Sequence, residues 1–178
     1  MSDVNRSIRK LESLATRWLK ELQENGFFIV PNMADEELLG KIRKVVKCAV
    51  ATQTKEQKIS QRSPGTLIGS KNYPELADLI GNPKVLEILT SMNLYDTKFW
   101  KAVIISKPPG GPKLYWHQDC LMWDDPRSYS KCPPMIFLMY YLEDTSPFNG
   151  CLRVLPGSHL KRHALHGAGV AHVDSINR

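Results

Sequence analysis

Apolar residues recur at three- and four-residue steps along the first 22 residues of the chain, with charged side chains between them. This spacing predicts an amphipathic helix, and Asn25-Gly26 predicts its end. A second helix is predicted after Asp35, which can cap it. Both helices are interpreted as scaffold. The apolar set of the first is Val4, Ile8, Leu11, Leu14, Ala15, Trp18, Leu19 and Leu22, and that of the second is Leu38, Leu39, Ile42, Val45, Val46 and Ala49.

The pattern changes between and after these two helices. The apolar run 27–30 predicts a short strand. Residues 54–71 lose periodicity and gain Ser, Gly, Pro and Gln, which predicts a surface loop. Pro74 and Pro83 suit the first turns of two more helices, the first of which ends near Gly81.

Beyond Asn93 the sequence favours strands over helices. Aromatic and β-branched residues predict strands over Thr97–Ser106, Lys113–Asp119 and Met135–Leu142, with Cys151–Leu155 leading into a Pro-Gly turn. Turns are predicted at 108–112 and 146–150. The sequence therefore predicts a single α+β domain over residues 1–178, mainly helical over 1–95 and β-rich over 96–178, with a sandwich or barrel-like core.

Charge and composition narrow the classes of function. The chain has 178 residues, with 24 Lys and Arg against 18 Asp and Glu, so the net charge is 24 − 18 = +6. This excess is spread evenly along the chain, whereas nucleic-acid binding favours a clustered basic face, so no nucleic-acid partner is expected. No apolar run reaches the roughly 20 residues that span a bilayer. The spacing of the four cysteines suggests no disulfide framework, and the charged N-terminus does not resemble a signal peptide, which predicts a reducing, cytoplasmic location.

The candidate chemistry lies in the predicted strand 113–119. Alternate side chains of a strand share a face, so Tyr115, His117 and Asp119 are expected on one face, with Trp116 and Gln118 on the other. The Cα atoms of His117 and Asp119 would lie about 6.5 Å apart, which lets both side chains reach one ion. Such a pair supplies two thirds of the two-His-one-carboxylate triad that binds Fe(II). A surface salt bridge is the alternative explanation.

The segments around this pair resemble the phytanoyl-CoA dioxygenase family of Fe(II)- and 2-oxoglutarate-dependent oxygenases. Four motifs match in order: Lys107-Pro108-Pro109-Gly110-Gly111, Leu114-Tyr115-Trp116-His117-Gln118-Asp119, Tyr141-Leu142-Glu143-Asp144, and Asn149-Gly150-Cys151-Leu152-Arg153-Val154-Leu155-Pro156-Gly157-Ser158-His159. Upstream, Asn25-Gly26-Phe27-Phe28-Ile29-Val30 and the Asp35 helix resemble the family's N-terminal entry.

The resemblance implies a fold and a reaction. The fold is a double-stranded β-helix, a jelly-roll or cupin-like barrel, on which N-terminal helices pack. The reaction is hydroxylation of a small organic substrate by O2, with 2-oxoglutarate converted to succinate and CO2. His117 and Asp119 would be catalytic residues that bind Fe(II), and Val103 and Met139 would lie near 2-oxoglutarate. Oligomeric state and substrate identity are left open.

The chain departs from the family pattern after residue 159. The distal histidine ligand and the arginine that binds 2-oxoglutarate with two hydrogen bonds would both fall beyond Arg178. The second half of the barrel is therefore expected to be missing from this chain, through a partial record or a natural truncation, and the isolated chain is expected to hold iron weakly. His159 is interpreted as part of a structural hydrogen-bonded turn. His163, His166 and His172 are interpreted as solvated or loop histidines.

Three rival interpretations remain. One is a small zinc-binding module built from His117 and three cysteines, although these lack the usual two close ligand pairs. A second is a non-catalytic binding protein with an oxygenase-like fold. A third is nucleophilic catalysis that pairs Cys120 or Cys151 with a histidine. The acidic, aromatic stretch Leu121–Pro134 follows the proposed ligands and is either a roof over the pocket or a plain exposed loop.

Overall fold

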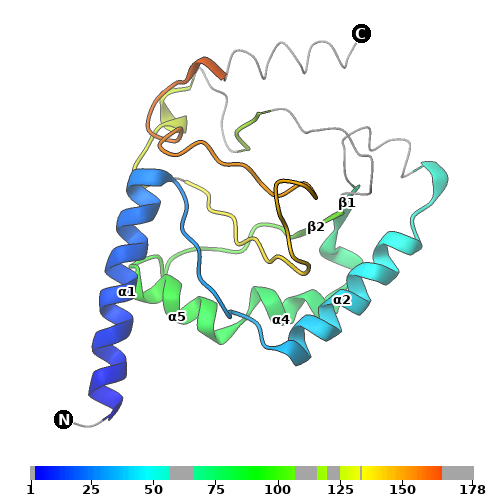
Figure 1. Ribbon diagram of the computed structural model, residues 1–178, viewed down its shortest axis with the longest axis horizontal. Helices are drawn as coiled ribbons and strands as arrows, with labels where there is room; N and C mark the ends of the chain where they lie inside the picture. The colour runs from blue at the N-terminus through cyan, green and yellow to red at the C-terminus, as the bar shows by residue number, and fades with distance from the viewer. Residues whose placement is uncertain (1–2, 57–65, 107–115, 120–124, 133, 166–178) are drawn as a thin grey trace. The chain divides into compact units, whose positions relative to one another are not determined.

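A computed structural model of the chain describes residues 3–56, 66–106, 116–119, 125–132 and 134–165 (Figure 1). The chain divides into two compact units. The first comprises Met1–Ile29, Tyr115–Tyr140 and Leu152–Arg178, and the second comprises Val30–Leu114 and Tyr141–Cys151. Each unit is therefore assembled from segments that lie far apart in sequence.

The first unit is dominated by helix α1, Asp3–Asn25, as the apolar stripe predicts. The buried residues of its second half are Ala15, Trp18 and Leu22. Gly26 ends the helix at a φ of +86°, a conformation that glycine adopts at little cost. The prediction of a strand over 27–30 is wrong, because these residues have irregular backbone. Phe28 instead stacks on Trp18, with 6.0 Å between the ring centroids.

The second unit contains the other helices. Helix α2, Glu36–Ala51, begins as predicted, with the Asp35 carboxylate accepting a hydrogen bond from the Leu38 amide at 2.9 Å. The helix predicted from Pro74 is a 3₁₀ turn, η2 (Pro74–Leu76), that runs into α4 (Ala77–Ile80). Helix α5, Pro83–Ser91, follows, and the Asn82 side chain caps it. The apolar core of this unit comprises Ile42, Ala49, Leu76, Leu79, Val85, Ile88, Leu89, Met92 and Ile104.

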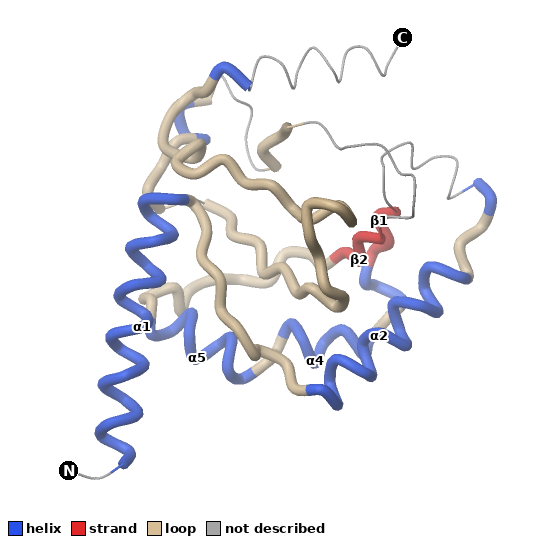
Figure 2. Tube along the Cα trace, in the orientation of Figure 1, coloured by secondary structure: helices blue, strands red, loops and turns tan. Residues whose placement is uncertain are grey.

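Two short strands form an antiparallel sheet in the second unit (Figure 2). Strand β1, Thr66–Gly69, pairs with β2, Val103–Ser106, in the register Thr66↔Ser106. The prediction of a loop over 54–71 is therefore wrong at residues 66–69, and the strand predicted over 97–106 is limited to its last four residues. A 3₁₀ turn, η1 (Ser70–Asn72), follows β1. Residues 57–65 lie outside the described part of the chain.

The other predicted strands do not form ladders in the described residues. Residues 116–119 and 135–142 have irregular backbone, so the strand assignments are wrong there, and residues 151–155, which lead into the Pro-Gly turn, are irregular as well. Residues 107–115, which include the predicted turn at 108–112, are not described. The turn predicted at 146–150 is present, with Gly150 at a φ of +87°. The fold is thus mixed helix with a small two-stranded sheet, and the jelly-roll barrel stays a prediction. No helix in the described segments combines the length and apolarity needed to span a membrane.

Candidate metal site

His117 and Asp119 lie in a short irregular segment of the first unit. Residues 116–118 belong to neither a helix nor a strand, and Asp119 sits in a bend. The two side chains nevertheless approach each other, with 3.5 Å between Nε2 of His117 and Oδ1 of Asp119. The His117 side chain is 35% exposed and that of Asp119 is 56% exposed, so both groups can be reached from solvent. The segment therefore offers an imidazole nitrogen and a carboxylate oxygen side by side.

The residue between them is anchored to a neighbouring turn. Nε2 of Gln118 donates a hydrogen bond of 3.0 Å to the main-chain oxygen of Ser128. Ser128 is 6% exposed and ends a 3₁₀ turn, η3 (Pro126–Ser128). Sequence patterning placed Gln118 on the face opposite the ligand pair and assigned it no role. The sequence signal that could have indicated an anchoring role is a long amide side chain placed between two candidate ligands.

The turn η3 is stabilised by its own capping residue. Oδ1 of Asp125 accepts a hydrogen bond of 2.9 Å from the Arg127 amide, and the Arg127 guanidinium also binds the Asp125 carboxylate. The guanidinium, and after it the amide, lower the pKa of Asp125 to about 2. The carboxylate is therefore ionised across the physiological pH range, which maintains the cap.

A cation–π contact lies beside the ligand pair. The Arg153 guanidinium carbon is 5.4 Å from the centroid of the Trp116 ring, within the range of such interactions. Trp116 belongs to the motif 114–119, and Arg153 belongs to the motif 149–159. The contact therefore joins two of the motifs on which the family resemblance rests. Sequence reasoning did not single out Arg153.

His159 takes part in a hydrogen-bonded turn, as expected. Its Nε2 donates to the main-chain oxygen of Gln23 at 3.1 Å, and its own main-chain oxygen accepts from the Ser130 amide at 3.0 Å. The Gly157 amide donates to the oxygen of Asn25 at 2.9 Å. The Pro156–His159 turn is therefore fixed both to the end of α1 and to the segment after η3.

The remaining candidate residues are scattered over both units. Val103 begins β2 in the second unit, and Met139 lies in irregular backbone in the first unit, both with exposed side chains. Their role beside 2-oxoglutarate stays a prediction. His163 is exposed, and its Nδ1 accepts a hydrogen bond of 3.2 Å from the Leu165 amide. His166 and His172 lie outside the described residues.

The described residues give no support to a zinc module. Within the described part of the chain, no group of three His, Cys, Asp or Glu side chains is placed to hold a metal ion. Cys120 is not among the described residues, and neither are 121–124 and Pro133 of the predicted roof. Cys48, Cys132 and Cys151 are free thiols. Among the described residues, no observation favours the pairing of Cys151 with a histidine, and it stays a hypothesis.

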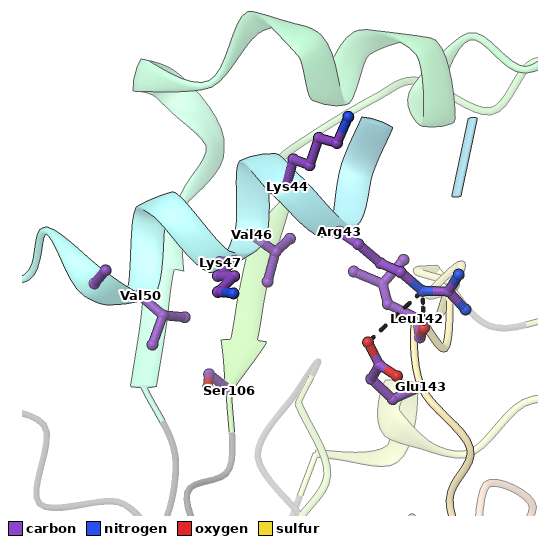
Figure 3. Close-up of a pocket in the computed structure, with 9 residues that line it drawn as sticks. Arg43, Lys44, Val46, Lys47, Val50, Ser106, Leu142 and Glu143 are labelled. Carbon is purple, nitrogen blue, oxygen red and sulfur yellow. Dashed lines mark hydrogen bonds and ion pairs between the residues drawn. The ribbon is translucent and has the colours of Figure 1, made fainter. Parts of the chain in front are cut away.

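A separate pocket of about 560 Å³ lies along α2 in the second unit (Figure 3). The surface of its lining is mostly apolar, although several lining residues carry charges, and Arg43 reaches across one end, donating from Nε to the main-chain oxygen of Leu142 at 2.6 Å. The same guanidinium nitrogen is 3.6 Å from Glu143, the carboxylate of the lining. That carboxylate is the single acidic group of the lining and it faces a cation, so the described residues form no metal site in this pocket. The other lining residues are Lys44, Val46, Lys47, Val50, Ala51 and Ser106.

Comparisons with known proteins point to one enzyme family. Ectoine dioxygenase from Nocardia farcinica is 27% identical to this chain over 150 residues, which are 79% of the chain and 50% of that relative. A probable alpha-ketoglutarate-dependent hypophosphite dioxygenase from Stutzerimonas stutzeri is 26% identical over 87 residues, which are 49% of the chain and 29% of that relative. The chain thus spans half or less of the length of these curated relatives. No solved structure matches it.

The family profile of phytanoyl-CoA dioxygenase matches residues 22–175. This match includes the His117–Asp119 pair, the turn that receives Gln118 and the Pro156–His159 turn. It covers most of the chain and agrees with the resemblance found in the motifs. The chain therefore belongs to the phytanoyl-CoA dioxygenase family.

Proposed function

We propose that this chain carries part of the active site of an Fe(II)- and 2-oxoglutarate-dependent dioxygenase that hydroxylates a small organic molecule. The observation that carries the proposal is the approach of His117 Nε2 to Asp119 Oδ1 at 3.5 Å. These are the residue types of two positions in the facial triad of non-haem iron oxygenases. Family membership and the names of both relatives support the class of reaction.

The two donor groups fit a ferrous ion. A neutral imidazole supplies a nitrogen lone pair, and an ionised carboxylate supplies an oxygen with negative charge, a mixture suited to Fe(II). Donor atoms bound about 2.1 Å from one ion at neighbouring positions lie roughly 3 Å apart. The separation of 3.5 Å requires only a small adjustment of either side chain. The pair therefore has the chemistry and the spacing of two ligands.

The reaction divides between the cofactors and the protein. When bound, iron and 2-oxoglutarate supply the activation of O2, so that one oxygen atom enters a substrate C–H bond and the other enters succinate as CO2 leaves. His117 and Asp119 would hold the ion through an imidazole nitrogen and a carboxylate oxygen, and a third protein ligand would be needed beside them. We assign that third ligand and the arginine that holds 2-oxoglutarate to family sequence beyond residue 178.

The barrel belongs to this proposal as well. Strand β2 buries Ile104 but exposes Val103 and Ile105 on its other face. A strand with two apolar faces suits the interior of a layered β-structure, in which both faces are covered. This pattern supports a jelly-roll with further strands against β2, within which Val103 and Met139 are assigned to the 2-oxoglutarate pocket. The proposed reducing, cytoplasmic location rests on the spacing of the four cysteines, which suggests no disulfide framework.

Iron binding under anaerobic conditions tests the assignment of the ligands. The unaltered 178-residue chain is expected to bind Fe(II) weakly, because it supplies two ligands, and to show little turnover. His117→Ala and Asp119→Ala are expected to weaken that binding at least 100-fold, which exceeds the usual effect of residues outside the ligand set, about 10- to 100-fold. His163→Ala is the matched control and is expected to leave the affinity unchanged.

Oxygen uptake tests the reaction itself. A chain extended to the length of its relatives is expected to consume O2 and release succinate only when Fe(II) and 2-oxoglutarate are both present. His117→Ala in that chain should abolish both signals. Fe(II) binding that survives the loss of His117 and Asp119 would refute the ligand assignment. Iron binding without any consumption of 2-oxoglutarate in the extended chain would instead favour a non-catalytic binding protein.

A further inference from the structure

We propose that Gln118 is a positioning residue for the metal ligands on either side of it. Its side-chain amide, held by the main-chain oxygen of Ser128, sets the directions in which His117 and Asp119 point. The inference rests on the proposed function of this pair as iron ligands. It adds a residue that contacts neither the metal nor the substrate.

The need for such an anchor follows from the local backbone. In a strand, ladder hydrogen bonds fix the direction of each side chain, and residues two apart share a face. Residues 116–119 have no strand ladder, so this source of order is absent from the segment. His117 and Asp119 nevertheless converge to 3.5 Å. Another contact must therefore hold the segment, and the Gln118 side chain makes one at 3.0 Å.

The oxygen that accepts from Gln118 is itself firmly held. Ser128 is 6% exposed, and its amide donates to the main-chain oxygen of Asp125 at 2.9 Å, which closes the turn η3. The Asp125 carboxylate caps the same turn through the amide and the side chain of Arg127. A capped turn whose last residue is buried offers a fixed point, whereas a fully exposed loop would move with the segment that it should hold.

The fixed point is connected to the longest helix of the unit. Two residues after Ser128, the Ser130 amide donates to the His159 oxygen at 3.0 Å, and the His159 ring donates to the oxygen of Gln23 in α1 at 3.1 Å. The Gly157 amide adds a bond of 2.9 Å to the oxygen of Asn25. Gln118 therefore ties the candidate ligands, through η3 and the Pro156–His159 turn, to the end of α1.

The consequence is an effect on metal affinity. If the Gln118 bond is lost, the backbone at residue 118 can rotate, and that rotation turns the two neighbouring side chains together. The ligands must then be reordered when the ion binds, and this cost lowers the affinity. Groups that orient metal ligands contribute about 10- to 100-fold to metal affinity in other proteins.

The test replaces the amide in the intact 178-residue chain and uses Co(II) as the probe. Gln118→Met keeps the length of the side chain but removes the donor. We expect the Kd for Co(II) to rise about 10-fold or more, and the visible ligand-field spectrum of bound Co(II) to change. Gln53→Met makes the same change at a half-buried position in the second unit, and we expect it to alter neither quantity.

A second variant separates the hydrogen bond from the stability of the chain. An ionised glutamate cannot donate to a carbonyl oxygen, but its negative charge favours a nearby cation. The added negative charge alone should strengthen Co(II) binding. Weaker binding in Gln118→Glu would therefore be caused by the lost hydrogen bond. In the unaltered chain, NMR should give nuclear Overhauser effects between the Gln118 side-chain amide protons and the protons of residues 128 and 129. Their absence would overturn the inference without reference to any metal.

The outcomes distinguish the inference from the proposed function. Should His117→Ala bind Co(II) as well as the unaltered chain, the ligand assignment of the proposed function fails. Should neither bind it measurably, as two ligands alone allow, the nuclear Overhauser effects of the Gln118 amide decide the inference. Should His117→Ala lose binding while Gln118→Met and Gln118→Glu keep the affinity and the spectrum, the ligand pair stands and the positioning role is wrong. A loss in both Gln118 variants, with thermal midpoints close to that of the unaltered chain, supports the positioning role.

Discussion

At the scale of single residues, the backbone conformation and the close packing at Gly26 both require the absence of a side chain. Its φ is +86°, and a Cβ at this position would lie 2.7 Å from Nδ1 of His159, closer than real contacts allow. Any other residue would therefore have to tolerate an unfavourable backbone conformation and displace the imidazole ring. The contact matters for the site because His159 connects α1 to the segment that follows η3.

Gly26→Ala is expected to destabilise the chain by roughly 1–3 kcal/mol, because a left-handed conformation costs an L-residue about 1–2 kcal/mol and the clash adds to it. Gly40→Ala is the control: it lies within α2 and an added Cβ meets nothing within 4 Å. It should stabilise by about 0.5–1 kcal/mol. Urea denaturation measures both, and effects of the same sign would contradict the argument.

The Asp125 carboxyl gives a prediction in pH. Its pKa of about 2 lies below the ordinary value of about 3.9, because the Arg127 guanidinium and amide bind the ionised form. A group with a depressed folded-state pKa stabilises the fold fully above its unfolded value, and that stabilisation is lost as the pH falls through the folded value. The cap of η3 should therefore weaken between about pH 4 and pH 2.

Arg127→Met separates the two causes. It removes the guanidinium, the larger cause, but keeps the main-chain amide, so the pKa of Asp125 should rise and remain below about 3.9. An NMR titration from about pH 1 to pH 6 measures this change through the chemical shift of the Asp125 carboxyl carbon. A pKa that stays near 2 in this variant would mean that the guanidinium contact is not formed in solution.

At the scale of elements, the start of α2 depends on the Asp35 cap. Asp35→Ala removes the acceptor of the Leu38 amide and should cost about 1 kcal/mol, whereas Asp35→Asn should retain most of the stability. Glu37→Ala in the exposed first turn is the control. It should cost only about a few tenths of a kcal/mol, because it alters the charge near the helix end but leaves the capping hydrogen bond in place. Urea denaturation and exchange of the Leu38 amide hydrogen measure the effects.

The helices were predictable because their determinants are local. The apolar stripe to Leu22, the cap at Asp35 and the prolines at 74 and 83 each act within one or two turns of the residues that they order. Strands require a partner that is distant in sequence. Thr66–Gly69 lies in a stretch rich in glycine, serine and proline, and only its pairing with Val103–Ser106 defines it as a strand. Residues 135–142 and 151–155 have strand-like composition, but the described residues offer them no paired strand.

The candidate site was predictable in part for the same reason. His117 and Asp119 are two residues apart, so motif spacing placed them together even though the expected strand is absent at 116–119. The contacts of Gln118 with Ser128 and of Arg153 with Trp116 cross 10 or more residues. Those contacts depend on where η3 and the later turn lie, which local periodicity does not encode.

At the scale of the whole molecule, both units carry large apolar side chains that remain exposed. In the first unit these include Phe137, Leu138, Met139, Leu152 and Val154, and in the second they include Phe99, Trp100, Val103 and Ile105. Scattered exposed apolar residues are ordinary, but groups from neighbouring positions mark surfaces that another element or partner covers. The relatives are at least twice as long as the segments matched here. The proposed barrel would use the additional sequence to cover these surfaces.

Strand β2 gives a matched test of that interpretation, because Ile104 and Ile105 are neighbours that point to opposite faces. Ile104 is 6% exposed and Ile105 is 59% exposed. In the 178-residue chain, Ile104→Ala should cost about 2–5 kcal/mol, whereas Ile105→Ala should cost about 0.5 kcal/mol or less and reduce binding of the dye ANS. Both variants replace isoleucine by alanine in the same strand, so both lose the same β-propensity and differ in the burial of the side chain.

In a chain extended to the length of its relatives, the proposed barrel would cover both faces of β2, so Ile105→Ala should approach the cost of Ile104→Ala. Urea denaturation of the four variants, two in each length of chain, measures the difference. Because the substitution is the same in both lengths of chain, an increased cost at residue 105 reports that added sequence buries this face. An Ile105→Ala cost that stays near zero in the extended chain would place the additional sequence elsewhere and remove the support that β2 gives to the barrel.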